Sequence, residues 1–191
     1  MRPSRKIEIE RLAELANVGT RRAAQAFAQL VGEPIRNLDC VVLEGEQRMA
    51  GDGVAGVDSG WSTGVFFEFE GCLDALVGIL FPAASSERLV RRIVGIDSGE
   101  LAPTVIESAL MEVGNILASH VASGIADALE SRLLPSIPSL AMEGAEQAFQ
   151  ELIEQVVGAG GGAVRIESAL QDEANQGRGR LVLVPTGLSS S

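Results

Sequence analysis

The stretch SALMEVGN places three polar side chains at helical spacing: Ser108, then Glu112 four residues later, then Asn115 after three more. A helix turns by about 100° per residue, so from Ser108 the other two side chains lie within about 40° on the same face. One carboxylate and one carboxamide can form hydrogen bonds with a partner, but they are too few ligands to hold Mg²⁺. The spacing therefore predicts a hydrogen-bonding ridge and no metal site in this chain.

The remaining positions of this helix indicate how the ridge is oriented. Apolar residues cluster on the opposite face, which predicts that this face packs against a sheet while the ridge points outward. They are Leu110, Val113, Leu117 and Val121. The outward face continues with small residues that would let another protein approach closely. These are Ser119, Ala122, Ser123 and Ala126.

The same pattern occurs earlier in the chain. Shifting the sequence by 98 positions places Glu14 over Glu112 and Asn17 over Asn115. The apolar residues around the first pair also fall on apolar residues around the second pair. We therefore expect one domain over residues 1–191, built from a repeat at about 8–95 and a second repeat at about 103–188. In each repeat a long helix leads into an extended segment, at 38–46 and at 136–144.

Other segments predict the elements that position these helices. A hairpin is expected at 65–69 and 73–81, and a second pair of strands at 163–170 and 180–185. Helices are expected after Pro82 with a serine cap, from Pro103 to about residue 134, and over 145–157.

Composition excludes several classes of function. A net charge of −11, from 15 basic and 26 acidic residues, opposes binding to nucleic acid or to anionic membranes. One histidine and two cysteines without a CxxC pair cannot form a zinc cluster. The absence of a long apolar run and of a signal-peptide pattern favours a cytoplasmic protein that does not insert into membranes.

Together these residues resemble the CheC/CheX/FliY family of chemotaxis phosphatases. The family motif is Asp or Ser, three residues, Glu, two residues, Asn, then a little over twenty residues to a Pro. Ser108, Glu112, Asn115 and Pro138 match it. The N-terminal phrase LAELANVGTRRAAQAFAQLVG is similar to the first helix of the family, and the duplicated motif is most like CheC.

The resemblance implies an α+β fold with pseudo-twofold symmetry, in which two long motif helices pack on an antiparallel sheet. It also implies an enzyme, a phosphatase that hydrolyses the aspartyl phosphate of a CheY-like receiver domain. Asn115 would position the attacking water and Glu112 would pair with a lysine of the receiver, with Ser108 and Pro138 as supporting residues. This chain would bind no cofactor, because the receiver supplies Mg²⁺. A CheD-like deamidase is a further partner that the resemblance allows.

The first motif departs from the family pattern. Glu10 stands where Asp or Ser is usual, and Cys40 stands where the proline is expected. Arg21 also adds a long charged side chain beside Asn17. We therefore expect Glu14 and Asn17 to contribute less than the second pair. The alternative hypothesis is a noncatalytic chemotaxis or motility adaptor that binds a receiver domain or a CheD-type deamidase.

Overall fold

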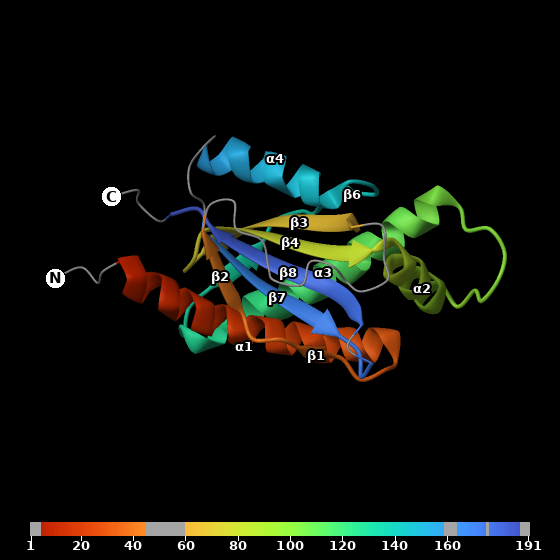
Figure 1. Ribbon diagram of the computed structural model, residues 1–191, viewed down its shortest axis with the longest axis horizontal. Coiled ribbons are helices and arrows are strands. Elements are labelled where there is room, and N and C mark those ends of the chain that lie inside the picture. The colour runs from red at the N-terminus through yellow and green to blue at the C-terminus, as the bar shows by residue number, and fades with distance from the viewer. Residues whose placement is uncertain (1–4, 45–59, 159–163, 175, 188–191) are drawn as a thin grey trace.

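The computed structural model describes residues 5–44, 60–158, 164–174 and 176–187. Within these ranges the chain forms four helices and eight strands (Figure 1). In chain order they are α1 (Arg5–Val31), β1 (Arg36–Asn37), β2 (Val41–Glu44), β3 (Trp61–Gly71), β4 (Ala75–Pro82), α2 (Ala83–Val94), α3 (Pro103–Ala128), β5 (Leu133–Pro135), β6 (Ser139–Ala141), α4 (Ala145–Val157), β7 (Val164–Gln171) and β8 (Gly177–Pro185).

All eight strands belong to one antiparallel sheet. Its order is β1-β7-β8-β4-β3-β5, with β2 also paired to β7 and β6 also paired to β3. The predicted α+β fold with an antiparallel sheet is confirmed. The longest strands, β3, β4, β7 and β8, are adjacent, so they form the centre on which the helices pack (Figure 1).

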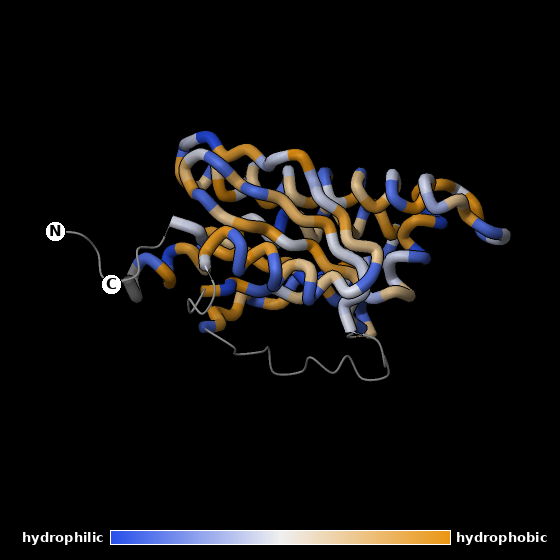
Figure 2. The backbone as a smooth tube through the Cα atoms, turned by 90° about the horizontal axis from the view of Figure 1, so that it is seen from above, coloured by the Kyte–Doolittle hydropathy of each residue, from blue (hydrophilic) through white to orange (hydrophobic). Residues whose placement is uncertain are grey.

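Both faces of this central sheet are buried. Alternate side chains of β3 point to opposite faces, so Val65 and Phe67 join the core beneath α1 and α3, while Phe66 packs with Phe149 of α4. The Phe66 and Phe149 rings are stacked with centroids 5.1 Å apart. Burial on both sides explains why β4 consists almost entirely of apolar residues and why Val65, Phe66 and Phe67 follow one another in β3. Hydrophobic stretches, drawn in orange, recur along the backbone through the middle of the molecule (Figure 2).

The short strands after α1 and α3 pair with the sheet in matching registers. Val42 lies opposite Ile166, and Leu140, which is 98 positions after Val42, lies opposite Val65. The N–H of Leu38 donates to the carbonyl of Ala169 at 2.8 Å, and the N–H of Ser136 donates to Glu68 at 2.7 Å. The shift of 98 positions that aligns the two Glu/Asn pairs therefore also aligns the segments that follow them.

The turn between β7 and β8 is held by a buried carboxylate. Asp172 accepts hydrogen bonds from the N–H groups of Ala174 and Gln176 and pairs with Arg178 at 2.6 Å. Desolvation acts to raise the pKa of Asp172, but the Gln176 N–H, the Arg178 charge and the Ala174 N–H together lower it below its ordinary value. The ionised form of Asp172 therefore stabilises the folded state.

Two predicted helix boundaries are wrong. The third helix ends at Ala128 instead of continuing to residue 134, because Glu130 adopts a left-handed φ of 49° and Leu133 already pairs with β3. The second helix begins at Ala83, directly after Pro82, without a serine cap. The hydroxyl of Ser86 instead donates to the Ala83 carbonyl at 2.9 Å inside the first turn.

Several other predicted elements agree with the structure. The helix expected at 145–157 is α4, and Gly95 ends α2 in a left-handed conformation. The predicted hairpin corresponds to β3 and β4, and the later strand pair corresponds to β7 and β8. Over the described residues, none of the helices is both long enough and apolar enough to span a membrane.

Candidate functional site

The outer side of α3 presents the predicted polar ridge. Ser108 and Glu112 are exposed and Asn115 is half-buried, whereas Leu110, Val113 and Leu117 on the inner side are fully buried. The expected orientation of this helix is therefore observed. Among the residues that the structure describes, none forms a hydrogen bond with the Asn115 amide. Both polar atoms of that carboxamide are thus available to a ligand.

Gly114 sets the distance between α3 and the sheet directly beside Asn115. A Cβ at this position would lie 2.6 Å from Cγ1 of Val65 and 2.8 Å from its Cβ. The helix backbone therefore approaches β3 more closely than any side chain would permit. Because Gly114 and Asn115 are adjacent in the chain, this contact also sets how far Asn115 lies from the sheet. The predictions from sequence did not include Gly114, although a glycine inside an apolar helical frame is the signal that could have identified it.

The expected track of small residues does not lie wholly on the outer surface. Ser119 and Ser123 are exposed, but Ala122 is 2% exposed and Ala126 is half-buried. The physical reason is the close contact between α1 and α3, where a Cβ at Gly124 would lie 2.9 Å from Cα of Gly19. Part of the track therefore serves the packing of the two helices instead of a partner.

The loop after α3 brings an apolar side chain near the end of the motif. Ile137 is 90% exposed and directly precedes Pro138, which is half-buried. The loop is fixed to β3, because the Glu68 N–H donates to the Ser136 hydroxyl oxygen at 2.9 Å. Sequence reasoning missed Ile137. Comparison of the repeats could have found it, since the equivalent position 98 residues earlier is the charged Asp39.

The first motif has a different environment. Glu10 and Glu14 are exposed on α1, and Asn17 is half-buried. The Oδ1 atom of Asn17 accepts a hydrogen bond of 2.8 Å from the backbone N–H of Cys40. Thr20, only 5% exposed, donates its hydroxyl to the Asn17 carbonyl at 3.3 Å. Asn17 therefore connects α1 to the segment that leads into β2.

The thiol of Cys40 lies beside this contact. Its sulfur is 3.8 Å from the Thr20 hydroxyl, and burial raises the pKa of Cys40 to about 11. The thiol is therefore protonated at neutral pH and is a weak nucleophile. Within the described ranges there is also no group of three His, Cys, Asp or Glu side chains that could hold a metal ion.

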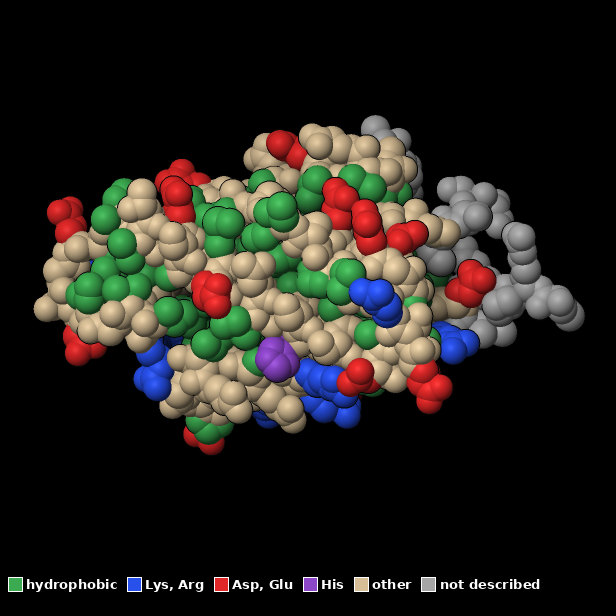
Figure 3. Space-filling model, turned by 180° about the vertical axis from the view of Figure 1, so that it is seen from behind, with side chains coloured by type: hydrophobic (Ala, Val, Ile, Leu, Met, Phe, Trp, Pro, Cys, Tyr) green, Lys and Arg blue, Asp and Glu red, His purple; other side chains and the backbone are tan. Residues whose placement is uncertain are grey.

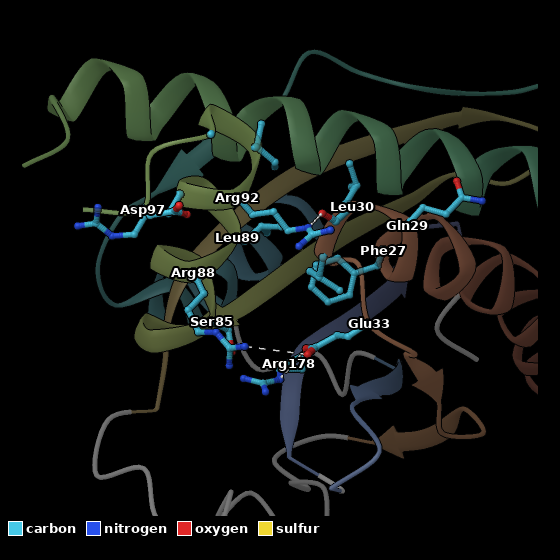
Figure 4. A pocket seen from close by; sticks show the side chains of 14 residues that line it. Phe27, Gln29, Leu30, Glu33, Ser85, Arg88, Leu89, Arg92, Asp97 and Arg178 are labelled. Carbon is cyan, nitrogen blue, oxygen red and sulfur yellow. Dashed lines mark hydrogen bonds and ion pairs between the residues drawn. The ribbon is translucent and has the colours of Figure 1, made fainter. Parts of the chain in front are cut away.

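A separate cleft of about 760 Å³ lies where the end of α1 meets α2 (Figure 4). It contains four arginines, and all four bind acceptors of the protein itself: Arg92 donates to the Leu30 carbonyl at 3.0 Å, Arg91 donates to the Gly99 carbonyl at 3.0 Å, and Arg178 and Arg88 pair with Glu33 at 3.4 Å and 4.0 Å. None of the motif residues lines this cleft. Arg92 and Arg88 connect α2 to the end of α1 and to Glu33 just beyond it.

The surface on the side of α3 is mainly uncharged. Seen from behind Figure 1, hydrophobic patches lie between acidic and basic side chains, some of which are grouped (Figure 3). Exposed apolar side chains in the described ranges include Ile137, Leu134 and Val105, which lie in α3 or in the segment that follows it. Apolar surface around a pair of polar side chains is typical of a protein interaction site.

The fold and the α3 motif define an α+β protein that presents a Glu/Asn pair on a helix covering an antiparallel sheet. A model of the CheC-like family matches residues 105–141, the segment that contains Ser108, Glu112, Asn115 and Pro138. The chain is also 26% identical over 178 residues to the CheY-P phosphatase CheC of Bacillus subtilis (strain 168), covering 88% of this chain and 82% of that protein. The resemblance to the CheC-like family is thereby confirmed.

Solved structures share the fold. FliY of Thermotoga maritima superposes with a TM-score of 0.68 and 14% identity, covering 98% of this chain and 94% of that chain. CheX in the CheX–CheY–BeF3–Mg complex of Borrelia burgdorferi superposes with a TM-score of 0.57 and 11% identity, covering 88% and 94%. At these identities the likeness establishes the common architecture.

Proposed function

We propose that this protein is a cytoplasmic phosphatase that hydrolyses the aspartyl phosphate of a CheY-like receiver domain. The observation that carries the proposal is the arrangement on α3, where Glu112 and Asn115 are presented together while the opposite face is fully buried. The relative named as a CheY-P phosphatase and the related CheX solved with CheY support this choice of substrate.

The proposed reaction needs little chemistry from this chain. Asn115 accepts a hydrogen bond from a water through its amide oxygen and so directs the oxygen lone pair of that water toward phosphorus. Hydrolysis then breaks the bond between phosphorus and the aspartate oxygen, which releases inorganic phosphate and restores the carboxylate. The receiver supplies Mg²⁺ and the positive groups that stabilise the transferred phosphoryl group. The contribution of Asn115 is therefore positioning.

Glu112 has a second role in the proposal. Its carboxylate is exposed one helical turn before Asn115, so it can pair with a lysine of the docked receiver. Such a pair orients the receiver relative to the water. Pro138 and Ile137 lie in the loop that follows α3, where Ile137 offers apolar surface for the same docking. No residue of this chain becomes covalently modified.

Timing of phosphate release from a purified phosphorylated receiver tests the proposal. The wild-type protein should accelerate release beyond spontaneous hydrolysis, and Asn115→Ala should remove most of the acceleration while keeping receiver affinity. Gln150→Ala, an exposed change on α4, is the control and should leave the rate unchanged. Binding without any acceleration would instead identify a noncatalytic adaptor.

A further inference from the structure

The two asparagines of the repeats differ in one hydrogen bond. The Cys40 N–H lies 2.8 Å from Oδ1 of Asn17. A backbone N–H can only donate, so the carboxamide must direct its oxygen toward it, which fixes the orientation of the amide. The amide oxygen of Asn17 is therefore directed toward the protein backbone.

The second repeat places a proline where the first has this donor. The segments around the two positions have the same register, because Leu38 and Ser136 both donate to the neighbouring long strand and Val42 and Leu140 both pair with it. Pro138 therefore occupies the place of Cys40. Proline has no backbone N–H, so the equivalent bond to Asn115 cannot form.

We propose that the residue at this place determines whether the asparagine is available for catalysis. On this view, which rests on the proposed phosphatase function, Pro138 is a positioning residue that leaves the Asn115 oxygen free to accept a hydrogen bond from water. The N–H of Cys40 donates to the Asn17 amide oxygen, so this oxygen cannot position a water and the first site is inactive. Rotating the Asn17 side chain outward would leave a partly buried N–H without an acceptor. This cost should reduce the fraction of molecules with an available Asn17 amide oxygen by about 5- to 150-fold.

This explanation differs from an obstruction by Arg21. That arginine is exposed, and its side chain can move without breaking a contact between elements. If Arg21 were the obstacle, Arg21→Ala alone would open the first site. If the hydrogen bond is the cause, Arg21→Ala should have no effect, whereas removal of the N–H at position 40 should.

The decisive experiment uses Asn115→Ala as a background, so that only the first site can act. Adding Cys40→Pro removes the N–H and should raise phosphate release from the phosphorylated receiver by about fivefold or more. Adding Cys40→Ala is the matched control: it removes the thiol, keeps the N–H, and should leave the rate unchanged. Equal recovery by both variants, or no recovery by a folded Cys40→Pro variant, would overturn the proposal.

The reverse substitution tests the same idea without relying on Cys40→Pro to fold. Pro138→Ala introduces an N–H beside Asn115 and should lower phosphate release by roughly 5- to 150-fold with unchanged receiver affinity. Amide hydrogen exchange supplies a readout that packing alone would not change. The new N–H at position 138 should be protected, and adding Asn115→Ala should remove that protection.

Hydrogen exchange also separates the inference from the proposed function. In the otherwise wild-type protein, Asn17→Ala should speed exchange of the Cys40 N–H by about fivefold or more. Unchanged exchange would refute the hydrogen bond even if the protein proves to be a phosphatase. If exchange changes as expected but the wild-type protein has no phosphatase activity, the proposed function and the catalytic role of Pro138 are both refuted. Only the hydrogen bond between Asn17 and the Cys40 N–H then remains established.

Discussion

Replacing Gly114 with alanine should damage activity much more than stability. The added Cβ would lie 2.6 Å from Cγ1 of Val65, whereas non-bonded carbon atoms are comfortable at about 3.5–4.0 Å. Val65 is fully buried on β3 and cannot turn away. Relief of the contact therefore requires α3 to move outward by about 1 Å, and Asn115 must move with it.

Two opposing terms set the expected change in stability. Overpacking a buried contact costs about 1–3 kcal/mol, while alanine is better than glycine inside a helix by about 1 kcal/mol. The free energy of unfolding should therefore fall by about 0–2 kcal/mol. A displacement near 1 Å costs about a hundredfold in a reaction that depends on positioning. The phosphatase rate should fall by about that factor in a protein that remains folded.

Phosphate release at saturating phosphorylated receiver, with urea unfolding in parallel, measures both effects. Gly60→Ala is the control, because a Cβ there meets nothing within 4 Å. Adding Val65→Ala to Gly114→Ala removes the contact with Cγ1 but keeps the Cβ of residue 65 at 2.8 Å, so it should restore only a small part of the rate. Full activity and higher stability in Gly114→Ala would refute the reasoning, since the helix would then accept the methyl group without moving.

Three further predictions concern docking, pH and metal. Ile137→Asp should weaken receiver binding about tenfold, as measured by titration calorimetry, whereas Val156→Asp on α4 should not; equal loss in both would contradict the placement of the docking surface. Because the pKa of Asp172 is lowered in the folded state, its contribution to stability is complete at neutral pH and is lost as pH falls below about 4. Asp172→Asn should therefore lower the free energy of unfolding at pH 7, and this free energy should then fall less steeply as the pH is lowered. If urea titrations show the same loss of stability at acidic pH in the variant and the wild type, Asp172 does not have this role. Chelation of Mg²⁺ should abolish release from the phosphorylated receiver without shifting the melting temperature of this protein alone; metal-dependent hydrolysis of a simple phosphate ester by the isolated chain would be inconsistent with a metal held by the receiver.

Local patterns in the sequence were sufficient for much of the architecture. The apolar period of α3 indicates which side faces the sheet, and Leu110, Val113 and Leu117 are buried as that period requires. The helix at 145–157 agrees with α4 at both ends, because Gly144 and Gly158 flank a continuous amphipathic segment. These features depend on interactions within a few residues, and such interactions are readable from spacing alone.

Other features depended on contacts between distant segments. Helical periodicity places Ala122 near the outer face, but only the crossing of α1 and α3 at Gly19 and Gly124 buries it. The end of α3 at Ala128 follows from the pairing of Leu133 with β3, which no local signal reveals.

The candidate site combines both kinds of information. Spacing alone brings Glu112 and Asn115 to one helical face, because residues three apart are neighbours on any helix. The contact between Asn17 and the Cys40 N–H joins residues 23 positions apart. It exists only because the sheet register brings the segment before β2 back against α1. The sequence by itself therefore determined which asparagines could act, and the tertiary structure determined which of them has its amide oxygen already occupied.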